Sequence, residues 1–440
     1  MHGYHSFNEM LASQNKDDTA LIFDTDDGKV SVSYGTLLKL INKGETVSEK
    51  TVGVFMDGSF HSILNVFSLC LQNKNVVLLN PMEEPKVLQE QILASDVERI
   101  MEDGLGFYRS YDRFSGKTSE LEHRILFFTS GTTDSSKPVV LSEEKLCASA
   151  YNGSALLPLT KDDVLLDILP LSHVFGFVCS LLWGLNCGAT VALGRGKHHI
   201  FEDFSYFHPT VVSLVPQMAK FFSKLNLFNK ELRLVLIGAG DCEDAVLSSI
   251  QKRSIRVSYG YGLTETSSGI ALSIGDDPRK MSVCPLDEVR IDSDGEILVR
   301  SPSTMMDGYY HDPAKTENSF TDGYFHTGDL GKFTEDGYLV LTGRKKDILV
   351  LSDGTKIYLP EYERQLGDIL GPKEDFAVSL NSNGAVTLFI YTENTGEDIE
   401  KKVKQFNSTK SIGNAVSKIC MRDKPIPRTM TFKVKRYLLK

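Results

Sequence analysis

The chain has 440 residues, and its 48 basic and 58 acidic side chains give it a formal net charge of −10 at pH 7. A chain this acidic is poorly suited to cover a polyphosphate backbone, so we do not expect nucleic acid as a partner. Hydrophobic residues make up 41% of the chain and charged residues 24%, which excludes intrinsic disorder. A chain of this size buries a large core, which excludes a small disulfide scaffold.

The seven cysteines are scattered and form no Cys-x-x-Cys pair. We therefore expect thiols in a reducing compartment rather than disulfides or a zinc site. The first residues lack a basic segment followed by an apolar one, so no signal peptide is expected. The apolar stretches are far shorter than the about 20 residues that cross a bilayer. These features predict a cytoplasmic protein with no membrane span.

Short apolar runs alternate with longer amphipathic stretches through the first half of the chain. This alternation predicts an α/β fold, in which parallel strands are joined by crossover helices. The expected strands are 52–56, 76–79, 164–169, 190–193, 211–215 and 232–237, and the expected helices are 59–72, 84–93 and 175–185.

After about Asp276 the pattern changes to short β-like segments separated by Asp-Gly turns, which indicates a β-rich subdomain. The last hundred residues read as a smaller α+β unit, with helices over 359–370 and 397–407 and strands over 376–380 and 386–391. We place the boundary near Gly343. The prediction is a large N-terminal domain of mainly parallel α/β layers, residues 1–343, and a small C-terminal domain, residues 344–440.

The first candidate site follows the apolar run 125–128, which leads into hydroxyl residues around one glycine and ends at a lysine. Backbone N–H groups and small hydroxyls in a tight turn can surround phosphate oxygens, and a lysine adds positive charge. It is not a Walker loop, because no glycine precedes Lys137 and Pro138 takes the Ser/Thr position. Taken alone, a Ser/Thr-rich surface turn explains the segment equally well. The candidate phosphate-binding residues are Thr129, Ser130, Gly131, Thr132, Thr133 and Lys137.

The second candidate site combines two tyrosines, two glycines, a threonine and a glutamate. Tyrosine rings offer flat faces to a heterocycle, and Glu265 offers a hard carboxylate suited to Mg²⁺. A hairpin with a polar tip is the alternative. Farther on, Asp329 follows a glycine turn and could hold a ribose diol, although Asp after Gly is also common in turns. The second site comprises Tyr259, Gly260, Tyr261, Gly262, Leu263, Thr264 and Glu265.

The segments described above, and several others listed below, resemble the motifs of the adenylate-forming enzyme family and occur in the same order. This family includes acyl- and aryl-CoA ligases, luciferases and peptide-synthetase adenylation domains, and the resemblance covers nearly the whole chain. The residues 170–176 (PLSHVFG) resemble the histidine motif beside the acyl pocket of that family. The other matching segments are 238–240, at the adenine-contacting turn, 306–310, 322–324, 327–329, the hinge motif 343–347, and 427–433, which resembles Pro-Arg-Thr-x-x-Gly-Lys.

The resemblance implies specific roles for residues in these segments. Residues 129–133 and Lys137 would bind the ATP phosphates, Thr264 the α-phosphate and Glu265 a Mg²⁺ ion. Lys433, on a small mobile C-terminal lid that turns about Lys346, would stabilise charge while a carboxylate attacks the α-phosphorus. Adenine and ribose would contact Gly238, Ala239, Gly240, Tyr259, Gly260, Tyr261, Gly262, Leu263, Asp329 and Arg344, and the acid would contact His173, Val174, Phe175 and Phe177.

Two departures from the family pattern concern the residues nearest the chemistry. Asp134 stands where the family usually has glycine, and an acidic group beside a triphosphate is unfavourable unless it points outward. Phe432 replaces the glycine before Lys433, and Lys435 is a nearby alternative for the catalytic lysine. His173 could also be an ordinary hydrogen-bonded core histidine.

The implied function is ATP-dependent activation of a carboxylic acid to acyl-AMP with release of pyrophosphate, followed by transfer to a thiol. The thiol would be that of coenzyme A (CoA) or of the phosphopantetheine of an acyl carrier protein. Residues 174–183 contain no acid that could pair with a substrate ammonium, so a fatty or aromatic acid fits better than an amino acid. The alternative is a non-catalytic regulator that binds acyl groups or nucleotides; Asp134 and Phe432 favour it, whereas the retained Glu265 and Lys433 oppose it.

Overall fold

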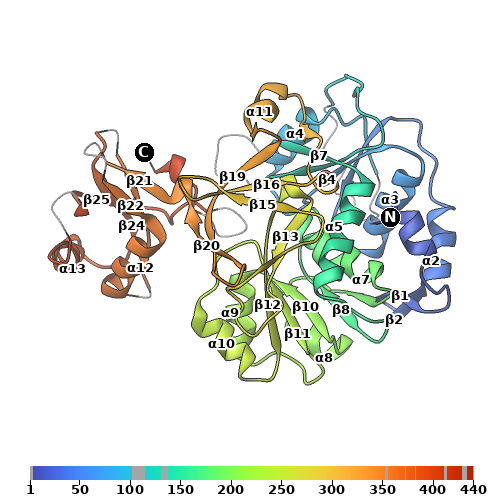
Figure 1. Cartoon of the computed structure of the whole chain (residues 1–440), viewed down its shortest axis with the longest axis horizontal. Helices are drawn as coiled ribbons and strands as arrows, with labels where there is room; N and C mark the ends of the chain where they lie inside the picture. Colours follow the sequence, from blue (N-terminus) through green and yellow to red (C-terminus); the bar gives the residue numbers. More distant parts are fainter. Residues whose placement is uncertain are drawn as a thin grey trace. The chain divides into compact units, whose positions relative to one another are not determined.

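The computed structural model describes residues 3–101, 114–129, 137–351, 355–371, 373–381, 383–410, 414–428 and 434–439. By the density of their contacts, the described residues form two compact units (Figure 1). The first contains the described residues up to Thr327 together with 332–340, and the second contains 328–331 and the residues from Leu341 onward. This division and the predicted boundary at residue 343 both fall within one strand, β20 (Leu339–Arg344). The mobile-lid role of the C-terminal part stays a prediction.

The smaller sheet of the first unit contains the strands expected near residues 52 and 76. Strands β3, β4, β5 and β6 are parallel, and every residue of β3 and β4 is buried, as expected for strands covered on both faces. Strand β7 is antiparallel to β6. Among the described residues the order is β17 (Gly308–Tyr309), β7 (Pro138–Leu141), β6 (Ile125–Phe128), β4 (Asn75–Leu79), β3 (Thr51–Phe55) and β5 (Arg99–Ile100), with crossover helices α3 (Phe60–Leu71) and α4 (Pro85–Ala94).

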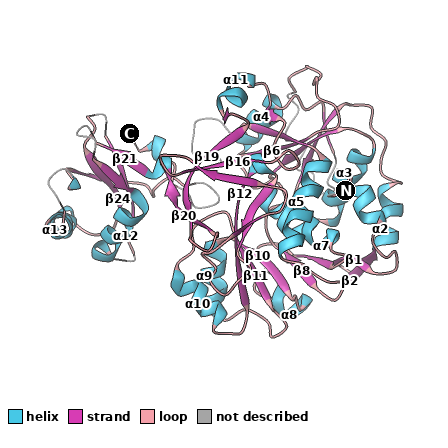
Figure 2. Ribbon diagram, in the orientation of Figure 1, coloured by secondary structure: helices cyan, strands magenta, loops and turns pink. Residues whose placement is uncertain are grey.

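The larger sheet has the order β14-β13-β12-β11-β10-β8-β9-β1-β2 in the described part of the chain. Its middle strands run parallel, which confirms the predicted α/β class (Figure 2). Its strands are β1 (Thr19–Thr25), β2 (Gly28–Ser33), β8 (Val164–Asp167), β9 (Thr190–Leu193), β10 (Val211–Leu214), β11 (Leu234–Ile237), β12 (Arg256–Leu263), β13 (Ser268–Leu272) and β14 (Ser282–Val283), and helices α5 (Glu143–Leu156), α8 (Asp203–Phe207), α9 (Pro216–Leu225) and α10 (Asp244–Gln251) accompany it.

The helix expected over 175–185 exists but is not a regular α-helix. It consists of α6 (Val174–Gly176), a π-helical segment η2 (Phe177–Leu182) and α7 (Trp183–Asn186). The ring of Phe177 lies 5.7 Å from that of Phe127 on β6, and the same π-helical segment contacts β8 and β10 of the larger sheet. The helix is therefore packed between both sheets.

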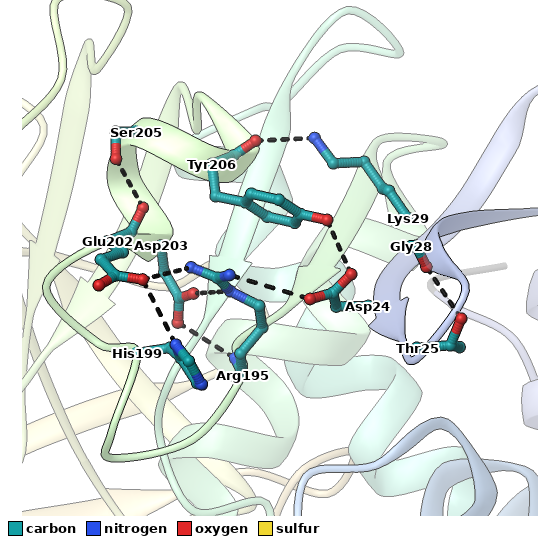
Figure 3. Close-up of polar contacts among 10 residues, drawn as sticks. All are labelled: Asp24, Thr25, Gly28, Lys29, Arg195, His199, Glu202, Asp203, Ser205 and Tyr206. Carbon is teal, nitrogen blue, oxygen red and sulfur yellow. Dashed lines mark hydrogen bonds and ion pairs between the residues drawn. The ribbon is translucent and has the colours of Figure 1, made fainter.

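The first 50 residues add a hairpin to the larger sheet that the sequence patterns did not reveal. Helices α1 (Phe7–Ala12) and α2 (Tyr34–Ile41) flank the β1–β2 hairpin. Polar contacts join the hairpin to α8 (Figure 3): the Tyr206 hydroxyl donates to Asp24 Oδ1 at 2.7 Å, and Lys29 Nζ donates to the Tyr206 carbonyl at 2.7 Å. The Arg195 guanidinium stacks on the Tyr206 ring and donates to the buried Asp203 carboxylate.

The β-rich region expected after Asp276 is confirmed. Its sheet has the order β15 (Glu288–Ile291), β16 (Glu296–Arg300), β19 (Tyr324–Phe333) and β18 (Phe320–Thr321), and β20 also pairs with β19. Helix α11 (Pro313–Asn318) lies in the same stretch of chain.

The second unit has the expected α+β composition and its own apolar core. Amphipathic helices α12 (Leu359–Leu370) and α13 (Gly396–Asn407) bury Leu366, Ile399 and Phe406 in this core. The strands are β21 (Ile348–Val350), β22 (Lys356–Tyr358), β23 (Asp375–Leu380), β24 (Val386–Tyr391) and β25 (Lys418–Met421), and short 3₁₀ turns cover Lys345–Asp347 and Arg436–Leu438. None of the described helices combines the length and apolarity needed to cross a lipid bilayer.

Candidate active site

The glycine-rich segment 259–266 is the end of β12 and the turn that joins it to β13. The two strands pair as a hairpin with a bulge between Tyr261 and Gly262. A Cβ atom at Gly262 would lie 1.6 Å from the carbonyl oxygen of Ser268, so only glycine fits this approach. The rings of Tyr259 and Tyr261 are buried. The hairpin expected as the alternative is therefore the local structure, and it presents Thr264 and Glu265 at its tip.

Glu265 lies in the short 3₁₀ turn Thr264–Thr266 and is partly exposed. Its Oε1 atom accepts a hydrogen bond of 2.8 Å from the Tyr309 hydroxyl, and its backbone carbonyl accepts one of 2.7 Å from the Met306 N–H. Burial, and secondarily the neighbouring carboxylate, raise the pKa of Tyr309 above its usual range, so this hydroxyl stays protonated and donates.

The donor set around Glu265 fits a magnesium ion that is bound together with phosphates. In the part of the chain that the structure describes, no hydrogen bond to Glu265 Oε2 is found, and no group of three His, Cys, Asp or Glu side chains could hold a metal alone. Mg²⁺ is commonly held by one or two carboxylates plus substrate phosphates. The single carboxylate is therefore suited to a metal that arrives with a nucleotide.

The segment Gly238–Gly240 follows β11 directly and forms a tight turn. Ala239 has a φ of 63°, which places a non-glycine residue in the left-handed region. The Tyr259 hydroxyl donates to the Gly240 carbonyl. A Cβ at Gly238 would lie 2.8 Å from Cε2 of Phe175, so the Phe175 ring packs directly on this turn. The structure thus brings together one predicted adenine-contacting segment and one predicted pocket residue.

The predicted histidine motif forms the start of the helix that is packed between the sheets. His173 is the N-cap residue of α6 and is partly exposed, and Gly176 is required because a Cβ there would lie 2.4 Å from the Pro170 carbonyl. Val174 is buried, and Phe175 is partly buried. Phe177 is fully buried in contact with other aromatic rings, so it packs in the core, and we leave it out of the pocket proposed below.

The predicted phosphate loop connects β6 to β7. Thr129 and Lys137 close this connection, since the Thr129 N–H donates to the Lys137 carbonyl at 3.4 Å. Ser130, Gly131, Thr132 and Thr133, together with Asp134, lie outside the described residues. The Lys137 ammonium forms an ion pair with Asp312, which also caps α11, and this pairing lowers the pKa of Asp312. Asp312 is a partner that sequence reasoning missed, because the two residues are 175 positions apart.

In the second unit, the two predicted ribose ligands contact each other. Arg344 Nε lies 2.7 Å from Oδ1 of the buried Asp329 carboxylate. Burial of a carboxylate is tolerated when a guanidinium satisfies it, and removal of either partner would leave the other uncompensated. Lys346 lies in the 3₁₀ turn that follows β20.

Lys433 lies outside the described residues, but the residues on either side of its segment are held to the second unit. Arg428 and Val434 form an antiparallel β-bridge. Arg428 pairs with Asp375 at 2.8 Å, and Arg436 pairs with Glu363 at 2.7 Å. Lys435 is partly exposed, and its N–H donates to the Pro427 carbonyl.

Comparisons with known proteins identify the family of this chain. A family model described as AMP-binding enzyme matches residues 116–310. The 2-succinylbenzoate–CoA ligase of Listeria monocytogenes is 30% identical over 331 residues, which are 72% of this chain and 69% of that protein. A long-chain-fatty-acid–CoA ligase of Mycobacterium bovis is 30% identical over 301 residues, 55% of this chain and 50% of that protein.

The fold is shared with a solved structure. The O-succinylbenzoate coenzyme A synthetase of Bacillus subtilis, in complex with ATP and magnesium ion, has a TM-score of 0.79 to this chain at 20% identity, covering 98% of both chains. The sequence relatives confirm the predicted family: the chain belongs to the AMP-binding enzyme family of adenylate-forming proteins and is an AMP-forming acid–thiol ligase.

Proposed function

We propose that this ligase activates an aromatic or fatty carboxylic acid that carries no ammonium group, and that CoA is the acceptor. The observation that carries the substrate proposal is the packing of Phe175 on Gly238, which places an apolar side chain against the predicted nucleotide-binding turn. No acidic side chain occurs over residues 174–183, so a substrate ammonium there would be buried without a partner. The two relatives described above act on 2-succinylbenzoate and on long-chain fatty acids, which supports both classes of acid.

In the proposed reaction, a carboxylate oxygen attacks the α-phosphorus of ATP, and the bond to the β-phosphate breaks to release pyrophosphate. Thr264 contacts the α-phosphate, and Lys433 stabilises the developing negative charge. Glu265 holds Mg²⁺, which neutralises phosphate charge when bound. Asp329 and Arg344 bind the ribose. A thiol then attacks the acyl carbon, its proton is released, and AMP leaves with the oxygen that the acid supplied.

The nucleotide contacts of 238–240 and 259–263 and the hinge role of Lys346 belong to the same proposal. Lys137 is proposed to bind a phosphate in addition to Asp312, because an ammonium has three N–H donors. A carrier-protein phosphopantetheine presents the same thiol as CoA, and product analysis with each acceptor in turn distinguishes them.

The seven cysteines are not disulfide-bonded in the structure. Several are deeply buried, and burial raises the pKa of Cys70 and Cys147 well above the usual range, so these thiols are unreactive. Unpaired cysteines are what a reducing compartment maintains, which supports the proposed cytoplasmic location.

The experiment that tests this function is carboxylate-dependent exchange of labelled pyrophosphate into ATP, measured over a panel of fatty and aryl acids. We expect exchange with at least one acid and a clear preference for a phenylpropanoate over phenylalanine. Preference for the amino acid would mean that an acidic side chain from another segment enters the pocket. Exchange with none of the fatty and aryl acids would contradict the proposed substrate classes.

A further inference from the structure

Three hydrogen bonds join the turn that carries Glu265 to the segment Thr304–Tyr309. The Ser267 hydroxyl donates to the Thr304 carbonyl at 2.6 Å, the Met306 N–H donates to the Glu265 carbonyl at 2.7 Å, and the Tyr309 hydroxyl donates to Glu265 Oε1 at 2.8 Å. The first two bonds fix the backbone of the turn. Only the third acts on the carboxylate itself.

Tyr309 is itself held rigidly, so its hydroxyl has a fixed position. It pairs with Val139 as part of the β17–β7 ladder, and its N–H donates to the Thr316 hydroxyl at 2.9 Å. The Lys315 ammonium lies 4.0 Å from the centre of its ring, and only 8% of the residue is exposed. A glutamate side chain in a partly exposed turn would otherwise sample several rotamers, and a fixed donor removes that freedom.

We propose that Tyr309 is a positioning residue for the metal ligand: its hydroxyl holds Glu265 Oε1 so that Oε2 faces the nucleotide metal. This inference rests on the metal-binding role proposed above for Glu265. It does not require Tyr309 to touch the metal, the nucleotide or the acid. Because the hydroxyl acts through a carboxylate, its removal changes the affinity for the metal rather than the affinity for ATP alone.

The neighbouring residue provides a matched control. Tyr310 is also buried, and its hydroxyl also donates to a carboxylate, that of Asp96 at 2.9 Å, so Tyr310→Phe removes the same group from the same stretch of chain without affecting Glu265. Tyr309→Phe, Tyr310→Phe and Glu265→Gln are compared with the parent protein. For each, calorimetry gives the affinity for ATP in EDTA and with increasing Mg²⁺, and Mn²⁺ binding to the ATP complex is followed by electron paramagnetic resonance.

A hydrogen bond to a charged group is usually strong enough that Tyr309→Phe should weaken metal affinity in the ATP complex by about tenfold. We expect metal-free ATP affinity to stay within about twofold of the parent value, and kcat of the exchange reaction to recover at saturating Mg²⁺, since the carboxylate remains. Tyr310→Phe should leave metal affinity unchanged. Adding Tyr309→Phe to Glu265→Gln should weaken it no further, because the two residues act as a unit.

Equal metal affinity in Tyr309→Phe and Tyr310→Phe overturns the positioning role while the role of Glu265 stands. An equal loss of ATP affinity with and without metal also overturns it, because a structural change would act on both. If Glu265→Gln itself leaves metal affinity unchanged, the proposed role of Glu265 is wrong. A further loss in the double variant would show that Tyr309 acts independently of Glu265, which contradicts the inference.

Discussion

The contact between Phe175 and Gly238 gives a quantitative prediction, because the structure shows what an added methyl group would meet. A Cβ at Gly238 would lie 2.8 Å from Cε2 and 2.9 Å from Cζ of Phe175, whereas non-bonded carbons normally approach to about 3.5–4.0 Å. The φ angle of Gly238 lies outside the left-handed region, so alanine adds no backbone strain there. In Gly238→Ala the Phe175 ring must therefore move, and overpacking of this kind costs about 1–3 kcal/mol.

The loss should be recovered when the ring is removed. Leucine lacks the two ring atoms that the methyl group would meet, so we expect the double variant Gly238→Ala/Phe175→Leu to show a favourable coupling of about 1–2 kcal/mol in the free energy of unfolding. Urea unfolding can be followed through Trp183, the single tryptophan, which is buried on α7 in the first unit. Gly240→Ala is a control for stability, since a Cβ there would be 3.4 Å from Pro216 Cγ, a much milder approach.

The same variant tests the pocket. If Phe175 lines the acid site, a displaced ring in Gly238→Ala should raise KM for the acid about tenfold, which corresponds to about 1.4 kcal/mol. Additive effects of Gly238→Ala and Phe175→Leu on unfolding would refute the packing contact. An unchanged KM for the acid, together with a measured loss of stability, would refute the pocket assignment alone.

Three further predictions concern Lys433, the stability of the protein at acidic pH and the boundary between the two units. Lys433→Ala should slow acyl-AMP formation by a factor of about 10²–10³ and should leave thioester formation from supplied acyl-AMP unchanged. If Lys435→Ala slows acyl-AMP formation and Lys433→Ala does not, Lys435 is the catalytic lysine and the motif was aligned incorrectly. Asp163 accepts two 2.7 Å bonds from Arg233 and others from Thr160 and Thr210, and these hold its pKa down to about 2 against the burial that opposes them. The ionised Asp163 stabilises the fold by about 2 kcal/mol at pH values above its unfolded pKa of about 3.9, and this stabilisation is lost as the pH falls towards 2. The difference in the free energy of unfolding between the parent protein and Asp163→Asn should therefore be constant from pH 7 to pH 5 and should become smaller below pH 4. A difference that is constant at all pH values would contradict this. Limited trypsin digestion should cleave at 344–346, where Arg344 and Lys346 are exposed, and release a C-terminal piece of about 10 kDa; resistance there with cleavage elsewhere would contradict a hinge.

Sequence patterns predicted the parallel strands because these strands are buried on both faces. The run Asn75–Leu79 is wholly buried and is apolar after its first residue, so its composition alone identifies a core strand. The β1–β2 hairpin escaped notice because its strands are only partly buried and carry charged side chains, among them Asp24 and Lys29, which contact α8. The π-helical segment Phe177–Leu182 lies between two sheets, and no local sequence pattern predicts that placement.

For the site, sequence reasoning supplied the chemical groups but not their partners. Gly262 was predicted as a nucleotide contact, whereas the structure shows that the nearby Ser268 carbonyl oxygen leaves no space for a larger residue there. Tyr309 stood inside a matched motif without any assigned role, because its contact with Glu265 joins residues 44 positions apart. Asp312 was missed for the same reason: ion pairs between distant segments depend on the fold that brings their strands together, and one sequence does not contain that information.

The central claim is that the carboxylate of the acid attacks the α-phosphorus of ATP, and the most direct test follows an oxygen atom. The protein is incubated with ATP, Mg²⁺, CoA and a substrate acid whose carboxylate is labelled with ¹⁸O at both positions, and the products are analysed by mass spectrometry. Because the acyl-adenylate keeps a bridging oxygen from the acid until the thiol displaces AMP, the account predicts AMP with one ¹⁸O atom and a thioester that retains the other. Formation of ADP and phosphate, or of AMP without label, would contradict it.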